Sequence, residues 1–209
     1  MAEDCAFCDR SKFEERLISE TELFYVVATL GQITEGGYAL IIPKYHLPCI
    51  ADMHDTKAGP FLNLVDEVRQ AIEKEYGQEV LIFEHGIVGQ SVKHAHLHLL
   101  PTGNIADKIA TTVRQDFVAE VDCFPTNHMD SLWEMYEKTK EPYLFWMDGS
   151  GTPYICWDPP APMQYLRTVI AKLLGRPERA NWRNMSPELD RQLWSDTVKR
   201  LKPYFKPRA

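Results

Sequence analysis

The order of apolar patterns along the chain predicts an α+β fold in which one helix lies on an antiparallel sheet. Residues 22–28 and 37–43 are apolar runs rich in β-branched and aromatic side chains, which is typical of strands. From 56 to 75 the apolar residues recur at helical spacing, and strand patterns return at 80–84 and 93–100. The order strand-strand-helix-strand-strand favours helices gathered on one face of an antiparallel sheet.

The first two strands are expected to form a hairpin with a long connection. Gly31 and Gly36 lie between them and interrupt the apolar pattern. The helix keeps Phe61 and Val68 on its apolar face and ends near Gly77.

The second half of the chain carries its own helix and strand patterns and contains no linker-like stretch. We expect a helix and a strand within 105–120, a helix over 129–139, a hairpin over 143–157, and helices over 163–174 and from Ser186 onward. We therefore predict two parts, 1–104 and 105–209, with the second packed on the first.

Composition places this chain of 209 residues among ordinary globular proteins, with 44% hydrophobic and 25% charged residues. The net charge of −7 argues against binding to duplex nucleic acid, which requires a basic face. A small anionic substrate remains compatible, because a site can be locally positive within an acidic protein. No apolar run approaches the roughly 20 residues of a membrane span, so no membrane partner is expected.

The 5 cysteines are an odd number and are scattered along the chain. Together with an N-terminus that lacks a signal-peptide pattern, this predicts reduced thiols and a cytoplasmic protein. Cys49, Cys123 and Cys156 are expected to be buried as small hydrophobic side chains.

Three of the 7 histidines, His94, His96 and His98, occupy alternate positions. Alternation at period two would place the three imidazoles in a row on one face of a strand, with Leu97 and Leu99 turned to the core. Such a row can bind a metal, hold an oxyanion or attack an electrophile. The sequence therefore predicts a functional site on this strand.

The segment resembles the signature of the histidine-triad (HIT) family of nucleotide hydrolases and transferases. Residues 94–100 fit the pattern His-φ-His-φ-His-φ-φ, where φ is apolar, and residues 89–92 match its Gly-Gln-Ser/Thr-Val lead-in. Upstream, residues 37–46 resemble the family's Gly-His-x-Leu-φ-Ile-Pro-Lys-x-His strand. The resemblance implies an antiparallel sheet of about five strands with a packed helix, followed here by a C-terminal α/β extension. Small members commonly pair, so a homodimer is expected.

The resemblance also implies a role for each residue of the motif. His96 is the nucleophile that takes the nucleotidyl group, since a neutral imidazole is a good nucleophile near neutral pH. His98 and Ser91 would hold the α-phosphate oxygens and assist the leaving group. Gln90 would donate a hydrogen bond to the same phosphate.

Cys5 and Cys8 have the spacing of half a zinc site and need two more ligands to complete a tetrahedron. Zinc-binding members of the family use the positions of His46 and His94, so the resemblance implies a closed, structural zinc and no organic cofactor. A catalytic zinc on the three triad histidines is disfavoured, because the cysteine pair and His46 offer a better site.

The chain departs from the family pattern at several positions. Tyr38 stands where histidine is common, Glu84 stands near the α-phosphate where the family has Asn or Gln, and no acidic residue for ribose hydroxyls follows the first strand. A carboxylate beside a phosphate is repulsive unless protonated or paired, so Glu84 faces another way or contacts a different group of the substrate. In the second half, Arg167 is the candidate for contacting a leaving group, because a guanidinium suits phosphate oxygens and Gln164 shares its helical face.

These features predict an enzyme that cleaves a nucleotide phosphoanhydride or phosphoramidate through a covalent His96-nucleotidyl intermediate, with a nucleotide as its partner. Hydrolase, transferase and phosphorylase differ only in the acceptor, and the motif does not specify it. The alternative is a non-catalytic nucleotide-binding or scaffold protein with a structural zinc. The intact triad, with Gln90 and Ser91 beside it, favours catalysis.

Overall fold

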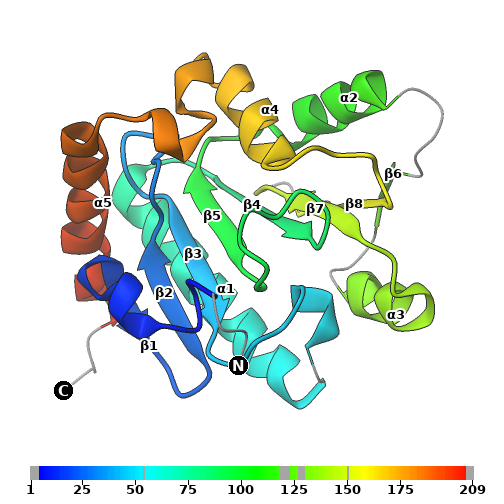
Figure 1. Cartoon of the computed structure of the whole chain (residues 1–209), viewed down its shortest axis with the longest axis horizontal. Helices are drawn as coiled ribbons and strands as arrows, with labels where there is room; N and C mark the ends of the chain where they lie inside the picture. The colour runs from blue at the N-terminus through cyan, green and yellow to red at the C-terminus, as the bar shows by residue number, and fades with distance from the viewer. Residues whose placement is uncertain (1–4, 54, 118–122, 127–129, 150, 206–209) are drawn as a thin grey trace.

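The structure, a computed structural model, describes residues 5–53, 55–117, 123–126, 130–149 and 151–205. Its centre is one antiparallel sheet of eight strands in the order β1-β2-β3-β5-β4-β7-β8-β6 (Figure 1). The strands are β1 (Leu17–Glu20), β2 (Phe24–Ala28), β3 (Ala39–Pro43), β4 (Val80–Gly86), β5 (Leu97–Pro101), β6 (Cys123–Pro125), β7 (Tyr143–Met147) and β8 (Tyr154–Trp157).

Helices cover both faces of this sheet. The α-helices are α1 (Asp55–Tyr76), α2 (Ala106–Asp116), α3 (Asp130–Thr139), α4 (Tyr165–Leu173) and α5 (Pro187–Leu201). Short 3-10 helices connect them: η1 (Arg10–Lys12), η2 (Glu14–Arg16), η3 (Ile50–Asp52), η4 (Pro177–Arg179), η5 (Trp182–Asn184) and η6 (Lys202–Phe205). In the described part of the chain, no helix is both long enough and apolar enough to cross a membrane.

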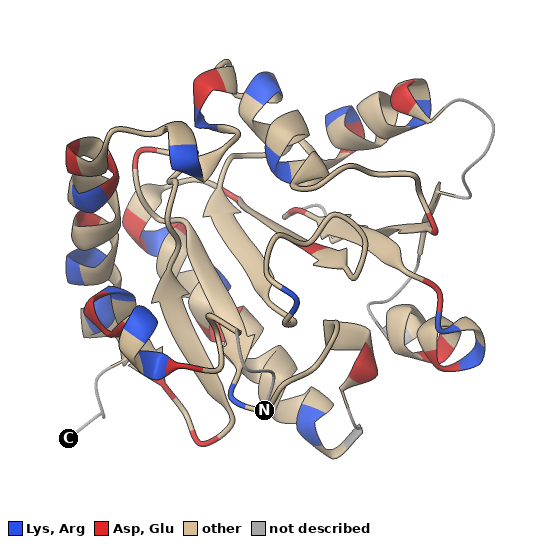
Figure 2. Cartoon of the chain, in the orientation of Figure 1, with Lys and Arg blue, Asp and Glu red and all other residues tan. Residues whose placement is uncertain are grey.

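Strand β3 illustrates why the central strands are apolar at every position. Ile41 belongs to the apolar cluster under α1 and α3, whereas its neighbours Leu40 and Ile42 belong to the cluster under α2 and α4. Because successive side chains point to opposite faces, a strand covered on both sides buries all of its residues. Charged residues accordingly lie mostly on the helices and connecting segments (Figure 2).

The predicted α+β fold is confirmed, and so are the hairpin of β2 and β3, the long helix α1, and strands at 80–84 and near 97–100. Helices α2, α3, α4 and α5 also lie where they were expected, although the strand expected towards residue 120 lies outside the described residues. Strand β1 was not predicted, because its four residues bury only Ile18.

The predicted hairpin of the second half forms as β7 and β8, and it packs on the first half by extending its sheet. Strand β7 pairs with β4, with Glu84 opposite Phe145. Strands from both sides of residue 104 therefore belong to one sheet. The division into 1–104 and 105–209 remains a prediction about how the chain folds.

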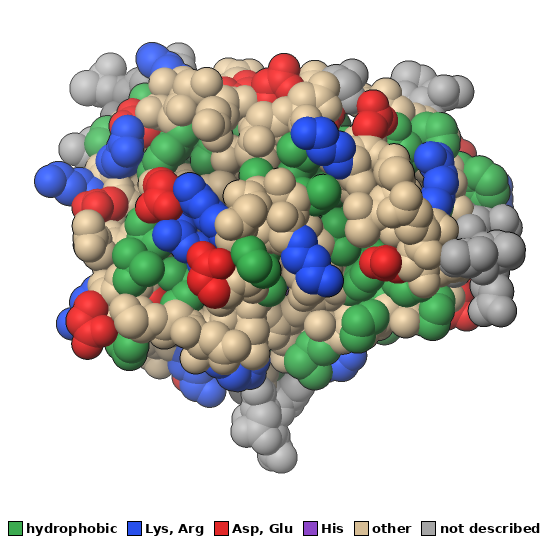
Figure 3. Space-filling view, turned by 90° about the horizontal axis from the view of Figure 1, so that it is seen from above, with side chains coloured by type: hydrophobic (Ala, Val, Ile, Leu, Met, Phe, Trp, Pro, Cys, Tyr) green, Lys and Arg blue, Asp and Glu red, His purple; other side chains and the backbone are tan. Residues whose placement is uncertain are grey.

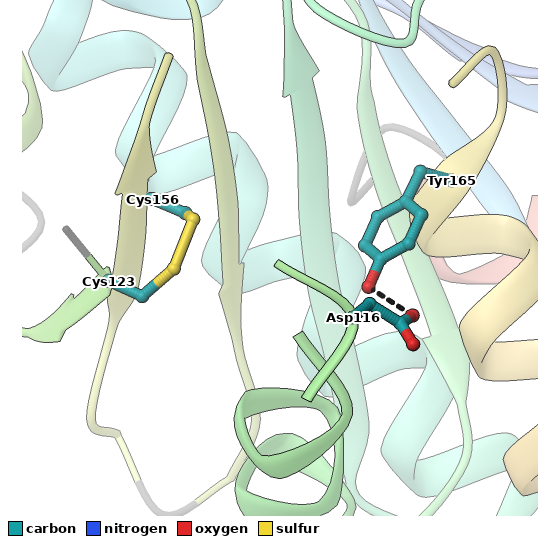
Figure 4. Close-up of a disulfide and its surroundings, with 4 residues drawn as sticks. All are labelled: Asp116, Cys123, Cys156 and Tyr165. Carbon is teal, nitrogen blue, oxygen red and sulfur yellow. Dashed lines mark hydrogen bonds between the residues drawn. A yellow bond between two sulfur atoms is a disulfide. The ribbon is translucent and has the colours of Figure 1, made fainter. Parts of the chain in front are cut away.

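Two expectations about local chemistry need correction. Cys123 and Cys156, expected as free thiols, form a disulfide between the paired strands β6 and β8 (Figure 4). The row of three histidines on a strand is also shorter than expected: β5 begins at Leu97, so only His98 lies in the strand and His94 and His96 precede it. The pairing register of β6 and β8 brings the two cysteines together, and neighbouring strands set the bend before β5. The local sequence pattern encodes neither of these.

Candidate active site

His96 and His98 line a cavity of about 190 Å³ that opens beside the first strands of the sheet. Its wall combines residues of the N-terminal segment, η1, η2, the loop after β2, β3, the loop before β5, β5, α4 and η5: Ala6, Phe7, Lys12, Arg16, Thr29, Leu30, Leu40, Ser91, Val92, His96, His98, Arg167 and Trp182. The first half supplies the histidines and most of the other lining residues, and the second half supplies Arg167 and Trp182. Both parts of the chain therefore build one site.

The electrostatics of this wall suit an anion. Lys12, Arg16 and Arg167 all line the cavity, and no acidic side chain is among its lining residues. The overall charge of −7 thus coexists with a locally positive site, as expected from the sequence. On the face seen in Figure 3, acidic and basic side chains are interspersed and form no single basic field.

The backbone fixes the protonation of His96. Its Nδ1 lies 2.6 Å from the carbonyl oxygen of His94, and a carbonyl only accepts, so Nδ1 carries the proton. Burial is the main cause that lowers the pKa of His96 to about 4, and the positive charge that His94 acquires on protonation lowers it further. The ring is therefore neutral at pH 7, and Nε2 keeps its lone pair.

His98 lies deeper, between aromatic rings. The Phe83 ring stacks on it with 4.2 Å between the centroids, and the Tyr38 hydroxyl lies 2.7 Å from its Nδ1. Its Nε2 is buried and has no hydrogen-bond partner among the described residues. Burial lowers the pKa of His98 well below its ordinary value, and the charges of His96, His85 and Arg167 lower it further.

The four predicted metal ligands lie together. The ligand atoms of Cys5, Cys8, His46 and His94 are all within 4.8 Å of one another. His94 Nδ1 is 3.2 Å from the Sγ of Cys5 and 3.4 Å from that of Cys8, and the His46 Nδ1 is 3.4 Å from the Cys8 Sγ. His94 Nε2 lies 2.9 Å from the carbonyl of Pro43, so that nitrogen holds the proton and Nδ1 is free to bind a cation. Two thiolates and two imidazoles are a donor set that fits tetrahedral zinc.

The remaining predicted site residues separate into two groups. Ser91 and Arg167 line the cavity, whereas Gln90 donates its amide N–H to the carbonyl of Pro48 and is not among the lining residues. Glu84 lies in the core and accepts hydrogen bonds from the Ile50 N–H at 2.7 Å and the Tyr143 hydroxyl at 2.5 Å. Both of its oxygens accept hydrogen bonds within the protein, and Glu84 is not among the residues that line the cavity.

Comparison with known proteins identifies the first half of the chain. The family described as "HIT domain" matches residues 10–105. The protein named Protein hit of Bacillus subtilis is 30% identical over 105 residues, which cover 48% of this chain and 72% of that protein. The adenosine 5'-monophosphoramidase hnt1 of Schizosaccharomyces pombe is 33% identical over 101 residues, covering 48% of this chain and 75% of that enzyme. The chain belongs to the HIT family.

One relative extends beyond the HIT part. The zinc finger CCCH domain-containing protein 64 of Arabidopsis thaliana is 26% identical over 219 residues, which cover 97% of this chain but only 36% of the longer plant protein. The second half of this HIT protein therefore has a counterpart in another chain.

Several residues around the HIT histidines were not found from the sequence. Lys12 and Arg16 lie on short 3-10 helices between the cysteine pair and β1, and Phe7 packs edge-on against His96 with 5.0 Å between the ring centroids. No periodic pattern marks these three residues, and Phe7 occupies a variable position of the Cys-x-x-Cys motif. Tyr38 was noticed only because it replaces a common histidine of the HIT pattern, and the sequence did not indicate that its hydroxyl reaches His98.

Proposed function

We propose that this chain is a HIT-type nucleotide hydrolase or nucleotidyltransferase that works through a covalent intermediate on His96. One observation carries the proposal: His96 lines a cationic cavity as a neutral imidazole whose Nδ1 proton is held by the His94 carbonyl. That arrangement leaves Nε2 as a nucleophile in a pocket that suits a phosphate.

In the first step the Nε2 lone pair of His96 attacks the α-phosphorus and forms a nitrogen–phosphorus bond. The bond between phosphorus and the leaving group breaks, and the leaving group departs with the electron pair. In the second step the oxygen of water or another acceptor attacks the phosphorus, and its proton passes to bulk water. The nitrogen–phosphorus bond breaks and the lone pair returns to Nε2.

The surrounding residues support this chemistry by binding the charge that spreads over the phosphoryl oxygens. Ser91 offers a hydroxyl donor, and Lys12, Arg16 and Arg167 bring positive charge to the same cavity. His98 stands beside His96, with 4.8 Å between their ring centroids. The relatives named as adenosine 5'-monophosphoramidases support a nucleoside phosphoramidate as the substrate class.

The test is to trap the intermediate. A slow nucleotide substrate is mixed with the protein, the reaction is quenched in alkaline denaturant because phosphohistidine is labile in acid, and the intact mass is measured. We expect an added nucleoside monophosphate in the wild type and none in His96→Asn. His46→Asn, which removes a proposed metal ligand and keeps His96, is the control that separates the loss of the metal cluster from the loss of the nucleophile. Robust turnover by His96→Asn rules out the assignment, and nucleotide binding without turnover by the wild type favours the scaffold alternative.

We also propose that Cys5, Cys8, His46 and His94 hold one structural zinc. The ion would tie the N-terminal segment to the start of the triad, and it would leave no coordination position open for substrate. Metal analysis of protein purified without chelator should give about one zinc per chain. Cys8→Ser should lose the metal and lower the melting temperature, whereas Cys49→Ala, at a buried cysteine outside the cluster, should keep it.

The second half is proposed to set substrate choice. Arg167 and Trp182 line the cavity, yet neither belongs to the part that carries the histidines. Trp182→Ala should raise KM and change the ranking among nucleotide substrates without abolishing cleavage of all of them. An unchanged ranking in this variant contradicts the proposal.

A further inference from the structure

The hydroxyl of Tyr38 forms a buried link between the second half of the chain and the last triad histidine. It lies 2.7 Å from Nδ1 of His98, and Tyr38 is completely buried. On the other side, the guanidinium carbon of Arg167 is 5.4 Å from the centre of the Tyr38 ring. Burial raises the pKa of Tyr38 to about 12, and the charge and hydrogen bond of Arg167 offset only part of that rise. The phenol therefore keeps its proton at neutral pH.

The location of this proton decides which nitrogen of His98 is protonated. Arg167 has only donors, so the Tyr38 proton must point to another group. Among the described residues, His98 Nδ1 is the acceptor that the hydroxyl reaches. A buried hydroxyl proton without an acceptor is unfavourable, so the Tyr38 O–H donates and Nδ1 accepts. The single proton of the neutral His98 ring is then on Nε2.

Nε2 of His98 is also the buried atom that lacks a partner within the described part of the protein. His98 lines the substrate cavity, and Phe83 stacked on its ring prevents the ring from turning away. A buried N–H without a partner is costly in the free protein and is satisfied when a phosphoryl oxygen enters.

We propose that Tyr38, held by Arg167, is a positioning residue that fixes His98 as a neutral Nε2–H donor to the phosphoryl group. This inference rests on the proposed function. His98 stabilises the developing negative charge by a hydrogen bond from Nε2–H, and it cannot act as a general base, because its Nδ1 lone pair accepts the tyrosine hydrogen bond and its Nε2 already carries a proton. Tyr38 acts only through His98.

The test reads the tautomer directly and requires no substrate. In protein labelled with nitrogen-15 on histidine, the His98 signals at pH 7.5 are expected to report a protonated Nε2 and an unprotonated Nδ1, with His98→Asn used for assignment. Tyr38→Phe should shift His98 towards a mixture of tautomers, and Tyr38→His, which restores an N–H donor, should recover the wild-type pattern. A wild-type His98 protonated on Nδ1 overturns the proposal. This measurement uses the wild-type protein, so it can be made even if Tyr38→Phe does not fold.

Kinetics give the second readout. Tyr38→Phe should lower kcat by about 10- to 100-fold while KM changes much less, since the affected contact strengthens as charge develops. The matched control is Tyr165→Phe, which removes a hydroxyl bonded to Asp116 at 2.8 Å outside the cavity (Figure 4) and should leave both the tautomer and kcat unchanged. An unchanged tautomer and an unchanged kcat in Tyr38→Phe refute the inference. If His96 proves not to be nucleotidylated, the tautomer measurement still stands, so the two proposals fail separately.

Discussion

At the scale of single residues, Glu84 makes the stability of the fold depend on pH. Burial raises the pKa of Glu84 from 4.5 to about 7, although the hydrogen bonds from Tyr143 and Ile50 oppose the rise. Between these two values the folded state binds more protons than the unfolded state, so the stability falls as the pH rises from about 4.5 through about 7. A shift of this size corresponds to about 3 kcal/mol.

Glu84→Gln removes this ionisation. We expect the variant to lose less stability than the wild type between pH 5 and pH 8, by about 2–3 kcal/mol, in urea unfolding followed by circular dichroism. Glu67→Gln, at an exposed position of α1, should keep the wild-type dependence. Equal pH dependence in the Glu84 variant and the wild type would contradict this account.

At the scale of elements, Arg167, Asp190 and Trp182 of the second half contact the loop that follows β2. Gly31 has a φ of 69°, its carbonyl accepts a hydrogen bond from Arg167 Nη2 at 2.8 Å, and its N–H donates to Asp190 Oδ1 at 2.7 Å. A Cβ at this position would clash with the Cβ of Trp182. The loop therefore requires glycine both for its left-handed backbone and for the close approach of η5.

Gly31→Ala is expected to cost on the order of 3 kcal/mol in urea unfolding and to raise KM, because Trp182 and Leu30 line the cavity. Gly175→Ala is the matched control: its φ is 70°, but no atom lies within 4 Å of the added Cβ, so only the backbone penalty of about 1 kcal/mol should remain. Equal losses of unfolding free energy in the two variants would show that the close contact between Gly31 and Trp182 does not contribute to stability.

The disulfide belongs to the same scale, since Cys123 and Cys156 join β6 to β8 across 33 residues of sequence. Closing a loop of that length restricts the unfolded chain and is worth up to about 4 kcal/mol. Dithiothreitol should therefore lower the melting temperature of the wild type but not that of a variant carrying Cys123→Ala and Cys156→Ala. A reductant effect of equal size in both proteins would be inconsistent with this bond.

At the scale of the whole molecule, the two halves share a sheet and a core. Strand β7 covers the edge of β4, and Trp146 and Ile170 of the second half join the apolar cluster that contains Phe83 of the first. A chain cut after residue 104 should expose this edge and the part of that cluster that remains in the first half, so it should aggregate or remain unfolded when expressed alone. Co-expression with 105–209 should restore soluble protein. A soluble 1–104 fragment with cooperative unfolding would support two independent domains instead.

The same pairing bears on the expected homodimer. Because β7 occupies the edge of β4 within the chain, a second copy cannot add a strand there, and the outer strands of the described sheet are β1 and β6. A dimer that forms by adding strand to strand must therefore use the edge of β1 or of β6. Light scattering after size-exclusion chromatography gives the mass in solution and decides between monomer and dimer.

The sequence by itself determined the features that depend on neighbours along the chain. The helical spacing of α1, the paired runs of β2 and β3, and the alternating His94, His96 and His98 are all local patterns. Periodicity records which face of a segment is apolar, and a motif records chemistry at fixed spacing, so both are readable without coordinates. The cluster of Cys5 and Cys8 with two distant histidines was accessible only through the family resemblance.

Tertiary structure alone decided the contacts between segments far apart in sequence. The Tyr38 hydroxyl reaches His98, Arg167 donates to the Gly31 carbonyl, and Glu84 accepts a hydrogen bond from Tyr143 in the core. Each contact depends on which strands become neighbours and in what register, and that choice is made by burying apolar surface over the whole sheet. For this reason the motif was enough to propose a role for His96, whereas the groups that orient the site left no signal in the sequence.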